Sequence, residues 1–240
     1  GYELPFDEAV KQELAIFREC MHGTQSKALR HMFAAEREVA RIPGLPAGTP
    51  ERNVERVGVI GLGVMGRGIV MALASAGLPV IAVGLDQGHV DAAMKAITKM
   101  WSSSVAKGSM SQETMDKRLA LIITSDDMHD LSVTQLVIEA VTEDLEIKKA
   151  VFSTLGQVTP AGTILASNTS FLNIDTLAEA SGRPEDLCGM HFFNPAHVMR
   201  LLENVRAEKT DPEVVATIMA LGKRIGKLPV LSGVCDGFIV

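Results

Sequence analysis

Hydrophobic positions from residue 54 onward alternate between short continuous runs and longer stretches with helical spacing. Continuous apolar runs occupy residues 56–60, 79–83, 120–123, 135–141 and 163–166. Between them, helical spacing covers residues 64–76, 89–118 and 144–156. Short apolar runs are typical of strands that are buried on both faces, and strands that alternate with helices predict a doubly wound α/β domain. We therefore expect a mostly parallel sheet covered by helices.

The first 53 residues have a different pattern. Apolar residues at three- and four-residue steps predict two amphipathic helices within residues 5–40, with a break at His22-Gly23-Thr24. Residues 41–53 (RIPGLPAGTPERN) are rich in proline and glycine and show no periodicity, which indicates a linker. A domain boundary is therefore expected near residue 54.

Composition narrows the class of protein. The 240 residues are 47% hydrophobic and 22% charged, enough to bury a core, and the net charge of -6 gives no general attraction to nucleic acid. Cys20, Cys188 and Cys235 form no Cys-x-x-Cys pair, so we expect neither a disulfide framework nor a zinc site. No apolar run reaches the roughly 20 residues of a membrane span, and the acidic start GYELPFDEAV is unlike a secretory signal. We expect a protein that is neither secreted nor inserted in a membrane.

Three glycines lie where the first apolar run meets the first helical stretch. Gly61, Gly63 and Gly66 have the spacing G-x-G-x-x-G. In this context Gly61 permits a tight turn, Gly63 lets the backbone approach a pyrophosphate, and Gly66 lets the helix pack closely on the strand. We therefore predict a Rossmann-like fold that binds a dinucleotide; the alternative is a tight turn without a ligand.

The acid that grips the adenine ribose is expected at the end of the second strand, about 20 residues after the glycines. Gly84 occupies that position, and Asp86 follows two residues later. Asp86 either contacts the ribose through a shifted turn or caps the next helix. No arginine lies just past the strand to receive a 2′-phosphate, so NAD is favoured over NADP.

Residues 191–203 (HFFNPAHVMRLLE) combine a histidine, an Asn-Pro pair and a glutamate with large apolar residues. Beside a nicotinamide, His191 can take the proton of a hydroxyl group as hydride leaves the same carbon, because imidazole titrates near neutral pH. Glu203 can hold the ring in one tautomer if the two residues lie on neighbouring strands joined by a short connection. The alternative is a core or surface histidine, which is our interpretation of His22, His31, His89, His129 and His197.

Five segments together resemble the L-3-hydroxyacyl-CoA dehydrogenase family, in the order and spacing that the family shows. They are VGVIGLGVMGRGI, VIEAVTEDLEIKKAVF, ASNTSFLNI, GMHFFNPAHVMRLLE and GKLPVLSGVCDGFIV, and the likeness covers about residues 54–240. It implies NAD-dependent oxidation of L-3-hydroxyacyl-CoA to 3-ketoacyl-CoA, a step of fatty-acid β-oxidation. It also implies that His191 is the catalytic base, Glu203 its carboxylate partner, and Ser170 a hydrogen-bonding partner of the substrate 3-oxygen.

Four further residues take roles from the same resemblance. Glu143, Lys148 and Asn194 resemble residues beside the nicotinamide ribose. Lys107, within the helical stretch 89–118 that contacts CoA in the family, is the candidate for a phosphate contact. Each has a structural alternative: an exposed helix-start pair for Glu143 and Lys148, a turn residue before proline for Asn194, and a solvated lysine for Lys107. Ser170 has one too, as a helix cap.

The ends of the sequence suggest a fragment of a larger enzyme. GTQSKALRHMFAAEREVARIP resembles the linker helix that joins an enoyl-CoA hydratase/isomerase domain to the dehydrogenase in multifunctional β-oxidation enzymes. In the family, an active-site asparagine and a helical domain follow the Gly-Phe-Ile-Val segment, whereas this sequence stops at Val240. We expect a helical linker over 1–53, an NAD-binding domain over 54–233, and the start of the helical domain over 234–240. The full chain would be cytoplasmic in a bacterium or peroxisomal in a eukaryote, and homo-oligomers are compatible with it.

Two other functions compete with this one. The 2-hydroxyacid-type β-hydroxyacid dehydrogenases share a Gly-x-Gly-x-Met-Gly turn, but they use a lysine base and lack the His-Phe-Phe-Asn-Pro segment. A non-catalytic relative that binds NAD or serves a structural role would also keep the fold. Gly84 favours such a relative slightly, whereas the presence of Ser170, His191 and Glu203 argues against it.

Overall fold

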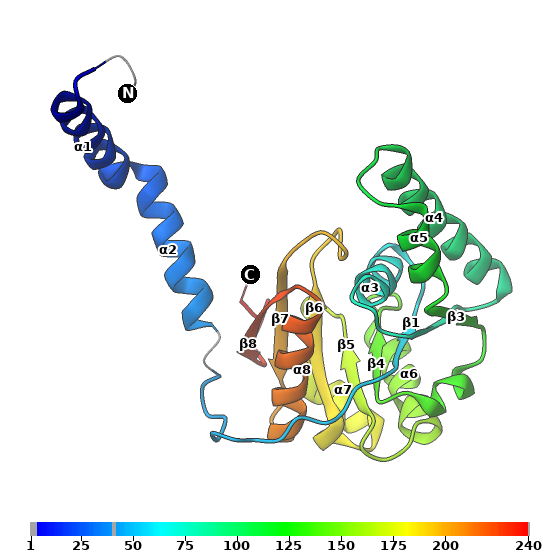
Figure 1. Ribbon diagram of the computed structural model, residues 1–240. Helices are drawn as coiled ribbons and strands as arrows, with labels where there is room; N and C mark the ends of the chain where they lie inside the picture. Colours follow the sequence, from blue (N-terminus) through cyan, green and yellow to red (C-terminus); the bar gives the residue numbers. More distant parts are fainter. Residues whose placement is uncertain (1–3, 40–41, 240) are drawn as a thin grey trace. The chain divides into compact units, whose positions relative to one another are not determined.

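The computed structural model describes residues 4–39 and 42–239, which divide into two compact units, Gly1–Pro43 and Gly44–Val240. The first unit holds the two expected helices, α1 (Phe6–His22) and α2 (Thr24–Glu38), shown in Figure 1. Gly23, in an extended conformation, separates them at the predicted break. Neither helix has a buried residue, so the described residues of this unit form no core of their own.

The second unit is built on an eight-stranded sheet with the order β3-β2-β1-β4-β5-β6-β7-β8. All neighbouring strands are parallel except β6 and β7, which run antiparallel. The mostly parallel, doubly wound sheet is therefore confirmed. The strands are β1 (Val57–Ile60), β2 (Val80–Val83), β3 (Ile122–Ser125), β4 (Leu136–Glu139), β5 (Ile164–Ser167), β6 (Leu187–Phe192), β7 (Leu201–Arg206) and β8 (Leu228–Gly233).

Helices cover both faces of this sheet (Figure 1). One core packs α3 (Val64–Ser75), α4 (Gln87–Ala106) and α8 (Pro212–Arg224) on one face. The other core packs α6 (Leu145–Val158), α7 (Ile174–Ser181) and the 3₁₀ helix η1 (Met128–Val133) on the opposite face. Strands β1, β2, β4 and β5 are buried throughout, which explains why their sequences read as continuous apolar runs.

The helical stretch expected over 89–118 is two helices rather than one. α4 ends at Ala106, Gly108 adopts a left-handed conformation with φ +72°, and α5 (Gln112–Leu119) begins after Ser111. The Ser111 side chain accepts a hydrogen bond from the Thr114 N–H and caps the new helix. A serine cap after a left-handed glycine therefore divides the apolar pattern into a helical pair.

The two compact units meet between Pro43 and Gly44, whereas the sequence predicts a domain boundary near residue 54. Residues 44–53 belong to the second unit, and Arg52 anchors them there. Its guanidinium pairs with Asp186 at 2.5 Å and Asp211 at 3.2 Å. The backbone N–H of Arg52 donates to the Thr217 hydroxyl at 2.8 Å. Residues 44–53 of the proline- and glycine-rich segment therefore belong to the second unit, where Arg52 holds their end.

Candidate active site

The glycine turn follows β1 directly and leads into α3. Gly61 has φ +91°, and a Cβ there would lie 2.7 Å from the Ala140 carbonyl; a Cβ at Gly66 would lie 1.8 Å from the Gly61 oxygen. These two glycines are therefore required by the fold itself. Gly63 differs, because its φ is -66° and a Cβ there would meet no atom within 4 Å. The protein does not need a glycine at position 63, so the open space above it fits a ligand that approaches the backbone.

The position of this turn suits an anionic dinucleotide. β1 lies between β2 and β4, so the chain connections diverge on either side of it, and this is where doubly wound sheets bind their ligands. The first N–H groups of α3 have no partner within the helix, and its first turn carries no acidic side chain. Both features favour a pyrophosphate at the start of α3. The residues present therefore fit the NAD that the sequence predicts.

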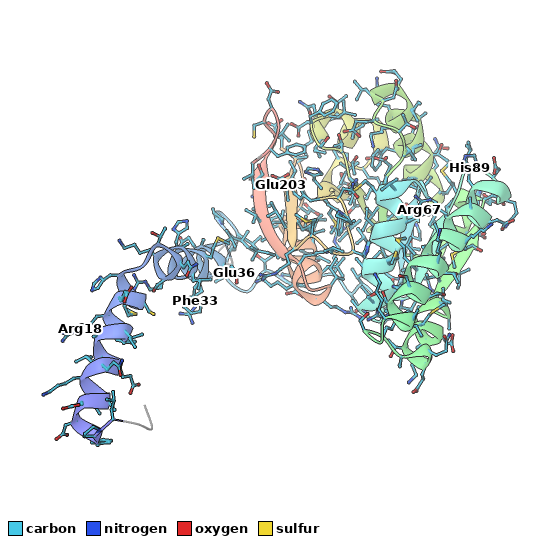
Figure 2. The ribbon with its side chains drawn as sticks, turned by 90° about the horizontal axis from the view of Figure 1, so that it is seen from above. Arg18, Phe33, Glu36, Arg67, His89 and Glu203 are labelled. Carbon is cyan, nitrogen blue, oxygen red and sulfur yellow. The ribbon has the colours of Figure 1, made fainter. Side chains whose placement is uncertain are left out.

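Asp86 caps α4 in the structure. Its carboxylate accepts a hydrogen bond from the His89 N–H at 2.8 Å and lies 2.9 Å from His89 Nδ1. These bonds, the backbone one first, hold the pKa of Asp86 below its usual value. A Cβ at Gly84 would lie 2.7 Å from a Val90 methyl group, so α4 packs closely at the position where an acid was expected. The capping role of Asp86 is present, and its contact with a ribose stays a prediction. Figure 2 shows His89 on α4 and Arg67 on neighbouring α3.

His191 and Glu203 occupy directly opposite positions on the antiparallel strands β6 and β7. Such pairs place their side chains on the same face of the sheet. Nδ1 of His191 lies 2.6 Å from Oε2 of Glu203, with 15% of the histidine side chain and 1% of the glutamate side chain exposed. A carboxylate can only accept, so Nδ1 carries the hydrogen and Nε2 is left as the basic nitrogen. Figure 2 labels Glu203 on its strand.

Further groups fix this pair. The other oxygen of Glu203 accepts a hydrogen bond from the Ile239 N–H at 3.2 Å. The ring of Phe193 lies 4.5 Å from the imidazole of His191, and the ring of Phe238 lies 6.3 Å from it. The imidazole is therefore held by one hydrogen bond and two aromatic contacts, while the glutamate uses both of its oxygens.

Glu143, Lys148 and Ser170 are brought together at the ends of β4 and β5. Lys148 Nζ lies 3.2 Å from Oε2 of Glu143, and Oε1 of Glu143 accepts hydrogen bonds from the Ser170 N–H and the Thr169 hydroxyl. Partial burial raises the pKa of Glu143, but the Thr169 and Ser170 hydrogen bonds and the Lys148 charge outweigh it. The net pKa of Glu143 is therefore below its usual value.

Among the described residues, Asn194 and Lys107 form no hydrogen bond or ion pair with the other candidates. Asn194 is exposed in the connection between β6 and β7, and Lys107 is exposed at the end of α4. Because α4 has 20 residues, about 30 Å of helix separates Lys107 from Asp86. The roles of both residues stay predictions.

Sequence reasoning missed three residues that organise this edge of the sheet. Glu139 is buried beneath Lys148, at 2.6 Å from its Nζ. Asn168 accepts a hydrogen bond from the Phe192 N–H at 2.8 Å and so joins the ends of β5 and β6. Lys227 donates to the carbonyls of Ala196 and Met199 and holds the β6–β7 connection. The one sequence signal that could have identified Glu139 and Asn168 is a polar residue at the end of an apolar run. The residues around Lys227 contain no such signal.

Large apolar side chains are exposed around the same edge of the sheet. They come from the start of α3, the β2–α4 turn, the start of α6, the β5–α7 loop and the β6–β7 connection: Val64, Leu85, Ile147, Phe171, Val198 and Met199. Soluble proteins expose groups of such residues where something binds. A cavity of about 390 Å³ lies elsewhere, lined by Arg52, Gln135 and Thr163 near the opposite ends of β4 and β5, and it contains none of the candidate residues.

Comparison with known proteins gives consistent matches. Residues 56–235 match the family described as 3-hydroxyacyl-CoA dehydrogenase, NAD binding domain. A peroxisomal bifunctional enzyme from Cavia porcellus is 38% identical over 99% of the chain, and a fatty acid oxidation complex subunit alpha from Psychrobacter arcticus is 36% identical over 99%. The crystal structure of 3-hydroxybutyryl-CoA dehydrogenase from Escherichia coli K12 superposes with a TM-score of 0.77 and 40% identity, over 78% of this chain and 40% of that one.

The chain spans about a third of these curated relatives, 33% in both cases. Among the described residues, no helix is long and apolar enough to cross a membrane. The resemblance found in the sequence and the NAD cofactor are confirmed by the family match.

Proposed function

This chain belongs to the 3-hydroxyacyl-CoA dehydrogenase family through its NAD-binding domain, and we propose that the protein oxidises an L-3-hydroxyacyl-CoA to the 3-ketoacyl-CoA. The observation that carries the proposal is the His191–Glu203 pair on β6 and β7, whose Nδ1 and Oε2 atoms are 2.6 Å apart. The family names of the relatives support the substrate class. Their length, about three times that of this chain, supports partner domains of hydratase/isomerase and helical type in the full protein.

The chemistry divides between the cofactor and the chain. NAD, when bound, accepts the hydride from C3 of the substrate. Nε2 of His191 takes the proton of the 3-hydroxyl group, and the C–O bond becomes a carbonyl as both hydrogens leave. Glu203 keeps Nδ1 protonated before the transfer and stabilises the imidazolium after it. In this proposal Ser170, on the β5–α7 loop, orients the 3-oxygen, and Lys107 is the candidate contact for a CoA phosphate.

The test compares substitutions of two histidines and one glutamate in the full-length protein. His191→Ala should lower kcat by roughly 10²–10⁴, the range for a positioned general base, with the NADH dissociation constant unchanged. Glu203→Gln should also lower kcat, because its amide N–H₂ would donate to Nδ1 and leave the hydrogen on Nε2. His129→Ala is the matched control, since the His129 side chain is exposed and, in the part of the chain that the structure describes, pairs with Asp127 alone.

The same measurements distinguish the proposed dehydrogenase from a non-catalytic relative that binds NAD. A non-catalytic relative that binds NAD would show no 3-hydroxyacyl-CoA oxidation in the parent protein, while its NADH binding would persist. If His191→Ala instead abolished NADH binding and left turnover per bound cofactor intact, His191 would be a structural residue. The base would then have to be sought elsewhere.

A further inference from the structure

A buried ion pair lies under the predicted cofactor site, and the proposed reaction leaves one of its members unused. Glu139, the last residue of β4, has a fully buried side chain, and Lys148 on α6 is only 1% exposed. Their charged atoms are 2.6 Å apart. Burying two charges is costly unless further hydrogen bonds satisfy them, so such a pair calls for an explanation beyond stability.

Glu139 is fully satisfied. One carboxylate oxygen accepts hydrogen bonds from Lys148 and from the Val141 N–H at 2.7 Å, and the other accepts one from the Ser167 hydroxyl at 2.7 Å. These donors come from α6, the β4–α6 turn and β5. Glu139 therefore fixes three segments of the chain around one carboxylate.

A continuous chain of contacts leads from Glu139 to the substrate side. Lys148 bridges Glu139 and Glu143, and Glu143 in turn holds the Ser170 N–H at 3.0 Å and the Thr169 hydroxyl. Thr169 Oγ1 also accepts hydrogen bonds from the two N–H groups that follow Ser170 in the chain. The loop that carries Ser170 is thus held by a carboxylate whose own position depends on Lys148.

We propose that Glu139 is a positioning residue that fixes Lys148 between two carboxylates and thereby aligns Glu143 and the Ser170 loop with the cofactor. The proposal rests on the proposed dehydrogenase function, in which Ser170 orients the 3-oxygen. Lys148 shares its charge between Glu139 and Glu143, so removal of one partner shifts it toward the other. A displacement of Glu143 moves the Ser170 loop with it, and small displacements of positioning groups are costly in rate.

Glu139→Gln tests this with little change of shape. The amide oxygen still accepts from Lys148, and the amide N–H₂ donates to Ser167, so the fold is retained while the charge is lost. We expect kcat to fall about tenfold while the NADH dissociation constant changes less than about threefold. Glu146→Gln is the matched control on the same helix, because Glu146 is exposed and, among the described residues, pairs with Lys149 alone; its kcat should equal that of the parent.

A second comparison separates positioning from stability. Leu155→Ala removes a buried side chain on the same helix, away from the site. It should lower the melting temperature at least as much as Glu139→Gln and leave kcat unchanged. If kcat instead follows the melting temperature across both variants, Glu139 acts through stability alone and the proposal is overturned.

The Ser170 amide provides a readout that requires no substrate. Its N–H donates to Glu143, so its NMR shift should titrate with that carboxylate. Glu139→Gln should move the midpoint to lower pH, because Lys148 then pairs with Glu143 alone, and Lys148→Met should move it to higher pH.

The two readouts distinguish the two proposals. The parent protein could lack dehydrogenase activity while the Glu139→Gln and Lys148→Met midpoints still shift as expected. That result would refute the proposed function and leave the Glu139–Lys148–Glu143–Ser170 contacts intact. Unchanged midpoints, or shifted midpoints with kcat equal to the parent, would overturn the positioning role.

Discussion

Valine at position 63 should weaken cofactor binding strongly and leave the fold intact. In the structure, a Cβ at Gly63 meets nothing within 4 Å, and the backbone there is extended with φ -66° and ψ -163°. A branched side chain adopts such angles readily, so the free energy of unfolding should change by less than about 1 kcal/mol. Because no atom of the described residues lies within 4 Å of that Cβ, we expect the new side chain to displace the ligand.

The size of the effect follows from the bonds that are lost. A pyrophosphate at the start of α3 accepts charge-assisted hydrogen bonds from backbone N–H groups, each contributing about 1.5–3 kcal/mol. A valine that keeps the phosphates away from two such groups costs about 3–6 kcal/mol, which raises the NADH dissociation constant by on the order of 10²–10⁴. Calorimetry with NADH measures this change directly.

Gly61→Val is the contrasting variant. Gly61 has φ +91°, and its Cβ would lie 2.7 Å from the Ala140 carbonyl, so this substitution should lower the melting temperature itself. The reasoning requires Gly63→Val to melt like the parent and Gly61→Val to melt earlier. An unchanged NADH dissociation constant for Gly63→Val would refute the assignment of the turn to the pyrophosphate.

Three further predictions concern other parts of the domain. Asp86→Ala should lower stability by about 1 kcal/mol, measured by thermal melting, because α4 loses its helix cap. If the variant also loses the preference for NAD over NADP, Asp86 contacts the ribose as well; an unchanged preference would exclude that contact. A thiol reagent should label exposed Cys20 and Cys235 in the native protein but reach Cys188 only after unfolding, because burial raises the pKa of that thiol; rapid labelling of all three would contradict the buried strand. Lys227→Met should lower stability by about 1–3 kcal/mol, because two carbonyls lose a charged donor, and an unchanged melting temperature would show that water replaces it.

The strands that the sequence predicts best are those with both faces buried. β1, β2, β4 and β5 lie in the middle of the sheet between two layers of helices, so nearly every position is apolar and the pattern is unambiguous. β8 was not predicted, because it is an edge strand with mixed burial that includes Pro229. α8 was not predicted either, although its apolar residues have helical spacing.

The site was predictable where spacing along the chain determines contact. The glycine turn is local, and its strand and helix are adjacent in sequence, so its structure follows from the motif. Glu139 and Lys148 are nine residues apart, and their contact depends on how the β4–α6 turn directs the helix back over the strand. A lysine within a helix that also contains Glu146 and Lys149 reads as a surface residue, so its burial could not be predicted from the pattern.

The reversal of strand direction between β6 and β7 creates the His191–Glu203 pair. A parallel partner for β6 needs a crossover of about a dozen residues, whereas residues 193–200 form a shorter connection that permits only an antiparallel partner. In that arrangement the register decides the chemistry: a slip of one residue would turn Glu203 to the opposite face of the sheet and leave His191 without its carboxylate. The connection is held at its middle by Lys227, through the carbonyls of Ala196 and Met199, and the end of β6 is held by Asn168. Among the described residues, the side chains of Lys227 and Asn168 form no hydrogen bond with His191 or Glu203, yet they oppose the slip. The precision of the His191–Glu203 contact therefore depends on the loop that separates the two residues.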